Sequence, residues 1–220
     1  MIPALPDPRA GLTADARAWF DDAVNRVIID PKAIRAVFPA VRRHCGRARL
    51  DPHWTVDEAA RAVLLTALPL RGPALADEVG TLHRHGDPAE QRAVLRALPL
   101  VDDEGRLLFL VRETLRGNDN TLIEAALGPY AAARLPDDEY RQAVLKCVFC
   151  EIPLARVAGL ADRADPELAR MLADFAHERI AAGRDVPEDI RSVVRSFPDV
   201  LDTFDAGTRS ALLTALNGVA

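Results

Sequence analysis

Residues 165–183 read DPELARMLADFAHERIAAG, and this stretch contains the signals that begin, maintain and end a helix. Asp165 is a typical N-cap residue, and the proline after it suits the first helical position. Apolar side chains at positions 168, 171, 172 and 175 recur at the spacing of one helix face, and Gly183 is a typical C-terminal stop. The stretch therefore predicts an amphipathic helix over 166–183.

Similar signals recur along the rest of the chain. Asp87 is followed by a proline and then by a glutamate, as Asp165 is. Thr55 and Thr121 each stand three residues before a glutamate, which is the spacing of a capping box. Sustained strand alternation and hairpin signals are absent, so we predict an all-α protein. The predicted helices span residues 13–29, 31–45, 56–68, 73–85, 88–98, 103–116, 121–134, 137–150, 154–160, 166–183, 187–196 and 206–217.

A faint internal repeat suggests how these helices are arranged. The segment AVLLTALPL at 62–70 resembles AVLRALPL at 93–100, and AVL at 143–145 with Pro-Leu at 153–154 is a further echo. Apolar helices that end in Pro-Leu at helix-pair spacing are typical of α-solenoids of the HEAT kind, although helices rich in alanine and leucine also look alike by chance. Short connections favour antiparallel neighbours. We expect a single helical domain over 1–220, in which antiparallel helix pairs stack as a short solenoid or α-α superhelix.

The amino-acid composition indicates where the protein is expected in the cell and which partners are not expected. The chain has 220 residues, 49% of them hydrophobic and 28% charged, which is typical of a globular protein with a sizeable core. Its net charge of −5 argues against a nucleic-acid partner, because such a partner requires clustered positive charge. No segment approaches the roughly 18 apolar residues of a membrane span. Three cysteines and the lack of a signal-peptide pattern lead us to expect a cytoplasmic protein that is not inserted in a membrane.

Sequence signatures of common catalytic and metal sites are absent. Glycine-rich phosphate loops, the GxSxG elbow and the HExxH zinc motif do not occur. Cys147 and Cys150 have CxxC spacing inside a predicted helix, where two small core residues are the simpler interpretation. His83 and His85 are two residues apart and cannot share a helix face. The sequence therefore predicts no metal site and leaves the cofactor unknown.

Lys146 stands out because it lies within a strongly apolar predicted helix. A lysine in such surroundings can act as a base or form a Schiff base. The alternative is a lysine that extends its charged end to solvent. Gln142 precedes Lys146 by four residues and shares its helix face. Both residues are therefore candidates for a polar site.

A dense polar cluster surrounds the start of the predicted helix 121–134. The simple interpretation places the cap at position 120 or 121, with Glu124 closing a capping box. That arrangement does not require Asn118 or Asp119. These two residues are therefore candidates for a polar binding edge.

A second polar cluster consists of His177, Glu178, Arg179 and Arg184, near the end of the helix quoted above. Glu178 is expected near the apolar edge of that helix, where a carboxylate needs a partner. Arg163, Arg179 or Arg184 could provide it. A structural ion-pair network and a ligand site are both compatible with this cluster.

Long motifs between residues 118 and 190 resemble those of a known family. They read TLIEAALGPYAA at 121–132, QAVLKCVF at 142–149, IPL at 152–154, ELARML at 167–172 and HERIAAGR at 177–184. This segment is similar to the EboA family, whereas residues 1–117 resemble it only loosely. The resemblance carries over no established catalytic residues.

The resemblance implies a role in a bacterial secondary-metabolite pathway. EboA-like proteins are encoded beside a UbiA-type prenyltransferase and other enzymes, and such clusters are linked to making or exporting a metabolite. We therefore expect an accessory protein that holds a small-molecule intermediate or docks pathway enzymes, including a membrane-bound prenyltransferase. The candidate ligand-binding residues are Asn118, Asp119, Gln142, Arg163, Arg179 and Arg184.

The alternative is an enzyme of unfamiliar type that acts on an intermediate of the same pathway. Lys146 or His177 would be its base, and Glu124 or Glu178 its acid, while arginines would hold a phosphate or carboxylate. Convergence of these side chains in one pocket would favour the enzyme. A scaffold without a small-molecule site is a third interpretation, which an exposed apolar patch would favour.

Overall fold

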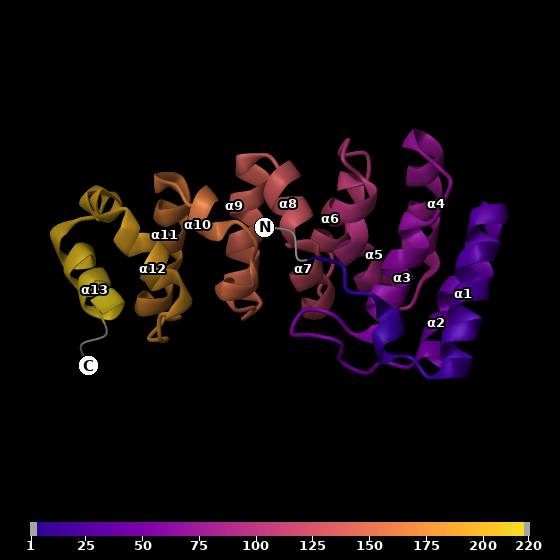
Figure 1. Cartoon of the computed structure of the whole chain (residues 1–220). Helices are drawn as coiled ribbons and strands as arrows, with labels where there is room; N and C mark the ends of the chain where they lie inside the picture. The colour runs from indigo at the N-terminus through magenta and orange to yellow at the C-terminus, as the bar shows by residue number, and fades with distance from the viewer. Residues whose placement is uncertain (1–3, 218–220) are drawn as a thin grey trace. The chain divides into compact units, whose positions relative to one another are not determined.

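The computed structural model describes residues 4–217 and confirms the all-α prediction (Figure 1). Within this range the residues form α-helices and short 3-10 helices, and the β-type pairing is confined to one isolated bridge between Arg49 and Thr55. None of the described helices has both the length and the apolar character needed to cross a membrane. The chain divides into two compact units, Met1–Arg134 and Leu135–Ala220, and each is described by itself. The single domain expected from the sequence stays a prediction.

The first unit is built from helices that pack mainly on their near neighbours in the chain, most extensively α3 on α5, followed by α1 on α2 and α5 on α7. Its core contains fully buried side chains such as Phe20, Phe38, Leu64 and Leu98. Burial of these side chains is the main source of the unit's stability. The elements are η1 (Pro8–Gly11), α1 (Ala14–Ile29), η2 (Pro31–Ala33), α2 (Ile34–Cys45), α3 (Val56–Thr66), α4 (Gly72–His85), α5 (Pro88–Val101), α6 (Leu108–Arg116), α7 (Asn120–Ala126) and α8 (Pro129–Arg134).

A charged side chain, Arg61, lies inside this core. Its guanidinium is fully buried and donates to Asp57 Oδ2 at 3.0 Å and to the carbonyl oxygen of Phe38 at 3.2 Å. The carboxylate of Glu90 lies 3.8 Å away. A buried charge is tolerated only when it is paired and hydrogen-bonded. Arg61 therefore fixes α3 relative to α2 and α5.

Glu58, also on α3, makes a second connection to α5. Its carboxylate accepts hydrogen bonds from Arg92 at 2.7 Å and from Arg96 at 3.1 Å. It also accepts one from the backbone N–H of Thr55 at 3.1 Å, as the predicted capping box requires. The same side chain thus begins α3 and ties it to its neighbour.

The helix predicted over 103–116 begins later, as α6 at Leu108, because Asp102 holds the preceding segment in a loop. The Asp102 carboxylate accepts hydrogen bonds from the backbone N–H groups of Gly105 (3.1 Å) and Leu107 (2.7 Å). It also accepts one from the hydroxyl of Tyr130. These bonds satisfy the carboxylate without a helix, so the loop replaces the predicted first turn.

Two other predicted helices are each divided in the structure. The predicted helix 121–134 forms α7 and α8, which separate just before Pro129, because a proline disfavours helical conformation in the residue before it. The helix predicted over 154–160 is wrong over most of its length: only η3 (Leu154–Arg156) forms within it, and α10 (Leu160–Arg163) begins at its last residue. Gly159, in a left-handed conformation, precedes α10.

The predicted repeat holds only in part. Its first two copies lie in α3 and α5, which pack against each other. The α3 helix ends at Thr66, before Pro69, as expected, but α5 continues through Pro99 to Val101. The second copy therefore departs from the pattern of a helix that ends before Pro-Leu, and HEAT-like stacking stays a prediction.

The second unit is organised around α11, which contacts α9, α12, η4 and α13. Asp165 caps α11 by accepting a hydrogen bond from Leu168 N–H at 2.8 Å, as the sequence predicts. Leu168 and Leu172 form part of its fully buried face. The further elements of this unit are α9 (Asp137–Phe149), η3, α10, α11 (Pro166–Ala181), α12 (Asp189–Ser196), η4 (Pro198–Thr203) and α13 (Ala206–Asn217).

Candidate functional site

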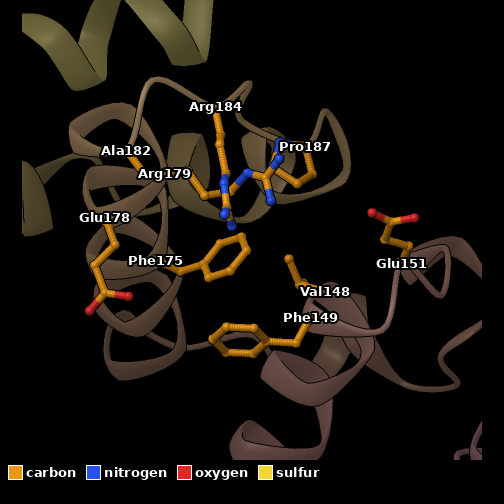
Figure 2. A pocket seen from close by; sticks show the side chains of 9 residues that line it. All are labelled: Val148, Phe149, Glu151, Phe175, Glu178, Arg179, Ala182, Arg184 and Pro187. Carbon is orange, nitrogen blue, oxygen red and sulfur yellow. The ribbon is translucent and has the colours of Figure 1, made fainter.

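A pocket of about 490 Å³ lies in the second unit, where the end of α9 faces the last turns of α11 (Figure 2). Three side chains of the predicted C-terminal cluster line it: Glu178, Arg179 and Arg184. Its volume is within the usual range of small-molecule pockets. The remaining lining residues are Val148, Phe149, Glu151, Phe175, Ala182 and Pro187.

The end of α11 brings two arginines together. Gly183 has a φ of +65°, and its N–H donates to Ile180 O at 2.9 Å. The N–H of Arg184 donates to Arg179 O at 2.8 Å, which completes a Schellman motif. Figure 2 shows that both side chains reach into the same region of the pocket, near Phe175.

The charges of these two guanidinium groups are not neutralised within the described part of the chain. Arg179 donates from Nε to the backbone carbonyl of Asp185, and its guanidinium carbon is 5.8 Å from the centroid of the Phe175 ring. No carboxylate of residues 4–217 forms an ion pair with Arg179 or Arg184. The carbonyl groups at the end of α11 favour positive charge there. The geometry also suits an anion bound between two guanidinium groups.

Glu178 differs from its predicted position. It was expected at the apolar edge of its helix, with an arginine partner, but the structure shows it exposed. An exposed carboxylate is solvated by water and needs no partner. The ion-pair network proposed for this cluster is therefore not formed by Glu178 in the described structure.

The end of α9 repeats the motif that ends α11. Ile152 N–H donates to Cys147 O at 2.8 Å, and Glu151 N–H donates to Val148 O at 3.2 Å. Glu151 has a φ of +57° and is the only residue other than glycine with positive φ among residues 4–217. Glycine is preferred at this position because other residues pay a steric cost in the left-handed region. Glu151 is therefore an unusual residue at the pocket wall.

Two aromatic rings provide the apolar part of the pocket. The rings of Phe149 and Phe175 pack edge to face, with centroids 4.7 Å apart and an interplanar angle of 76°. Phe175 is buried, but 60% of Phe149 is exposed. An exposed phenylalanine in a pocket leaves apolar surface available to a ligand.

Three other candidates belong to the same unit but are not among the lining residues. His177 packs edge-on against Phe204, with ring centroids 6.0 Å apart. Gln142 is exposed on α9, and Lys146 is partly exposed on the same helix. The pocket therefore does not bring the predicted bases, Lys146 and His177, to the arginine pair.

Arg163 occupies a structural position near the start of α9. It donates to Leu135 O at 2.8 Å and to Asp137 at 2.6 Å, and its guanidinium carbon lies 4.2 Å from the centroid of the Tyr140 ring. The hydrogen bond from Arg163 lowers the pKa of Asp137, and burial raises the pKa of Tyr140 to about 12. These contacts occupy Arg163, which does not line the pocket.

The remaining candidates, Asn118, Asp119 and Glu124, lie in the first unit. The cap of α7 was predicted at position 120 or 121, and this is wrong, because Asp119 accepts hydrogen bonds from the N–H groups of Thr121 (2.8 Å) and Leu122 (3.2 Å). The hydrogen bond from the Thr121 hydroxyl contributes most to lowering the pKa of Asp119. Asn118 is exposed, and Glu124 is half-buried on α7.

The second unit contains another pocket, of about 710 Å³, which sequence reasoning missed. Asp189, at the start of α12, accepts a hydrogen bond from Leu154 N–H at 2.8 Å and so ties η3 to α12 beside this pocket. Among the described residues, no group of three or more His, Cys, Asp or Glu side chains is placed to hold a metal ion. The second pocket is lined by residues of η3, α10 and α12 and of the segments that follow η3 and α12, including Val157, Leu160, Val193 and Phe197.

A family model described as metabolite traffic protein EboA matches residues 47–195. The matched region extends well into the part of the sequence that resembles the family only loosely, and it includes every residue that lines the arginine-containing pocket. Neither a curated protein nor a solved structure matches the chain. Because the family model covers more than half of the sequence, the chain belongs to the EboA family of metabolite traffic proteins.

Proposed function

We propose that this protein binds a small metabolite in the pocket between α9 and α11 and holds it during transfer. The observation that carries the proposal is the pair Arg179 and Arg184, which converge on one pocket without a carboxylate partner among the described residues. A bound anion would relieve the repulsion between the two guanidinium groups and accept hydrogen bonds from both.

The rest of the pocket supports a ligand that is apolar apart from its anionic group. Phe149 and Phe175 place two rings beneath the arginines (Figure 2). An aromatic surface beside a few convergent polar groups is typical of small-molecule sites. The family's description as metabolite traffic proteins agrees with binding of this kind.

The proposal assigns the pocket a binding role and gives no catalytic role to the predicted bases. Lys146 and His177 are not among the lining residues, so neither is placed beside an anion held by the arginines. The metabolite would be an intermediate of a bacterial secondary-metabolite pathway, as the family resemblance implies. Docking of pathway enzymes, including a membrane-bound prenyltransferase, stays a prediction.

Native mass spectrometry of the protein purified from its own cells tests the proposal. The wild type is compared with the Arg179→Ala/Arg184→Ala variant and with Arg170→Ala. Arg170 is a suitable control because it lies on the same helix and pairs with Glu167 (2.7 Å) and Asp174 (2.6 Å), outside the pocket. We expect a co-purifying small molecule in the wild type and in Arg170→Ala, and its loss in the double variant.

Two outcomes would contradict metabolite binding in this pocket. A small molecule retained at full occupancy by the double variant would place the ligand elsewhere in the chain. No bound small molecule in any form, together with a stable complex with another protein, would replace metabolite binding with the scaffold interpretation.

A further inference from the structure

We infer that Glu151 forms a second recognition point in this pocket, so that the ligand carries a hydrogen-bond donor at one end and an anionic group at the other. The inference rests on the proposed function, because it assumes that Arg179 and Arg184 bind the anionic group. It further specifies which chemical group the ligand carries at the end opposite its anionic group. The ligand class is therefore an apolar acid with a distal hydroxyl or amino group.

Figure 2 shows Glu151 and the two arginines on different walls of the pocket. Glu151 comes from the segment after α9, whereas Arg179 and Arg184 come from the end of α11. Within residues 4–217, the Glu151 carboxylate makes no hydrogen bond or ion pair. Glu178, the other acidic residue at the pocket, points away from the guanidinium groups (Figure 2). Glu151 is therefore the carboxylate placed to face a ligand held by the arginines.

The backbone at Glu151 provides an independent argument. The equivalent position after α11 is occupied by Gly183, which adopts positive φ without strain. At φ +57°, Glu151 is strained by roughly 1 kcal/mol relative to glycine. A residue other than glycine at a strained backbone position is a candidate for a functional role. Glu151 is exposed, and its carboxylate makes no hydrogen bond or ion pair within residues 4–217, so a donor on the ligand can bind it without displacing an intramolecular partner.

The chemistry of the three groups defines what the ligand must contain. An ionised carboxylate only accepts hydrogen bonds, so its partner on the ligand must be a donor. The guanidinium groups only donate, so their partner must be an acceptor, best an anion. The rings of Phe149 and Phe175 suit a planar or otherwise apolar body between these ends.

Three matched probes separate the contributions of the two ends: cinnamate, para-hydroxycinnamate and para-methoxycinnamate. All three carry the same acid and the same apolar body, but only the hydroxyl compound has a donor at the distal end. Their dissociation constants are measured by calorimetry for the wild type, Glu151→Gly, Arg179→Ala/Arg184→Ala and Arg170→Ala. Glu151→Gly is a clean variant, because glycine is the residue that the backbone prefers there.

We expect the wild type to bind para-hydroxycinnamate about tenfold more tightly than para-methoxycinnamate, the effect of one hydrogen bond to a charged acceptor. Glu151→Gly should abolish that difference and leave the affinity for cinnamate unchanged. The double arginine variant should weaken all three probes by at least about tenfold. Arg170→Ala should behave as the wild type.

The outcomes distinguish this inference from the proposed function. Equal binding of the three probes by the wild type, with loss in the double arginine variant, would overturn the role of Glu151 and leave the anion site intact. A hydroxyl preference that persists in Glu151→Gly would also overturn it. Binding that is unaffected by the arginine substitutions would contradict the proposed function itself.

Discussion

Glu151 and Gly183 occupy the same position in two copies of one helix-ending motif. Each has positive φ, +57° and +65°, directly after the cap of its helix. In each copy the N–H of the next residue reaches back to a carbonyl of the preceding helix at 2.8 Å. The two motifs bring the ends of α9 and α11 to one pocket, but only one of them uses the glycine that the conformation favours.

The shared backbone conformation predicts that two substitutions change the free energy of unfolding in opposite directions. Glu151→Gly should raise the free energy of unfolding by about 1 kcal/mol, because it removes left-handed strain. Gly183→Ala should lower it by about 1 kcal/mol. An added Cβ at Gly183 meets no atom within 4 Å, so the cost there is conformational and not a clash. Urea denaturation of both variants measures the two values, and a destabilised Glu151→Gly variant would show that the glutamate supports the fold.

A second prediction concerns the pH dependence of stability at Glu58. Burial alone would raise the pKa of this carboxyl, but Arg96 and Arg92 outweigh burial and lower it below its usual value. Because the folded-state pKa lies below the unfolded value of about 4.3, ionised Glu58 stabilises the fold above that pH. The contribution is lost as the pH falls through the folded-state pKa.

Glu58→Gln should therefore lower the free energy of unfolding by about 2 kcal/mol at neutral pH, since hydrogen bonds to charged groups are lost. Its difference from the wild type should shrink as the pH falls below about 4.3. Denaturant titrations at several pH values measure this difference. A deficit that stays constant down to acidic pH would mean that the charge of Glu58 does not stabilise the fold.

The start of α7 offers a matched pair of neighbouring residues. Asp119 caps the helix through two backbone N–H groups, whereas Asn118 is exposed. We expect Asp119→Ala to cost about 1 kcal/mol of stability, and Asn118→Ala to change it by less than about 0.5 kcal/mol. Thermal unfolding followed by circular dichroism compares the two variants. Equal effects would contradict the assignment of the cap to Asp119.

The sequence was sufficient to predict most of the helices, because their signals are local. Asp165 and Gly183 mark both ends of α11 within a single stretch of sequence. The late start of α6 was harder to predict, because the Asp102 carboxylate that holds the preceding loop also accepts a hydrogen bond from Tyr130, 28 residues further along the chain. The break between α7 and α8 was signalled by Gly128-Pro129, a pair typical of an interrupted helix.

The candidate site was also predictable in part, where its residues lie close together in the sequence. Arg179 and Arg184 belong to one continuous polar motif, so they were recognised as candidates. Phe149 and Glu151 were missed, because an exposed ring and a positive φ follow from the fold and not from residue type. A helix that ends without a glycine or asparagine was the one local signal that pointed to Glu151. Lys146 and His177 were selected by residue type, but neither lines the pocket.

Fluorine NMR of the protein labelled with para-fluorophenylalanine tests the central claim most directly. The chain has seven phenylalanines. Phe149 and Phe175 line the proposed site, and Phe197 lines the second pocket. Phe20 and Phe38 are buried in the first unit. Resonances are assigned by single Phe→Leu substitutions, and the sample is titrated with small molecules extracted from the protein's own cells. We predict shifts at Phe149 and Phe175 and none at Phe20 or Phe38. Shifts confined to Phe197, or to no residue at all, would contradict a metabolite site between α9 and α11.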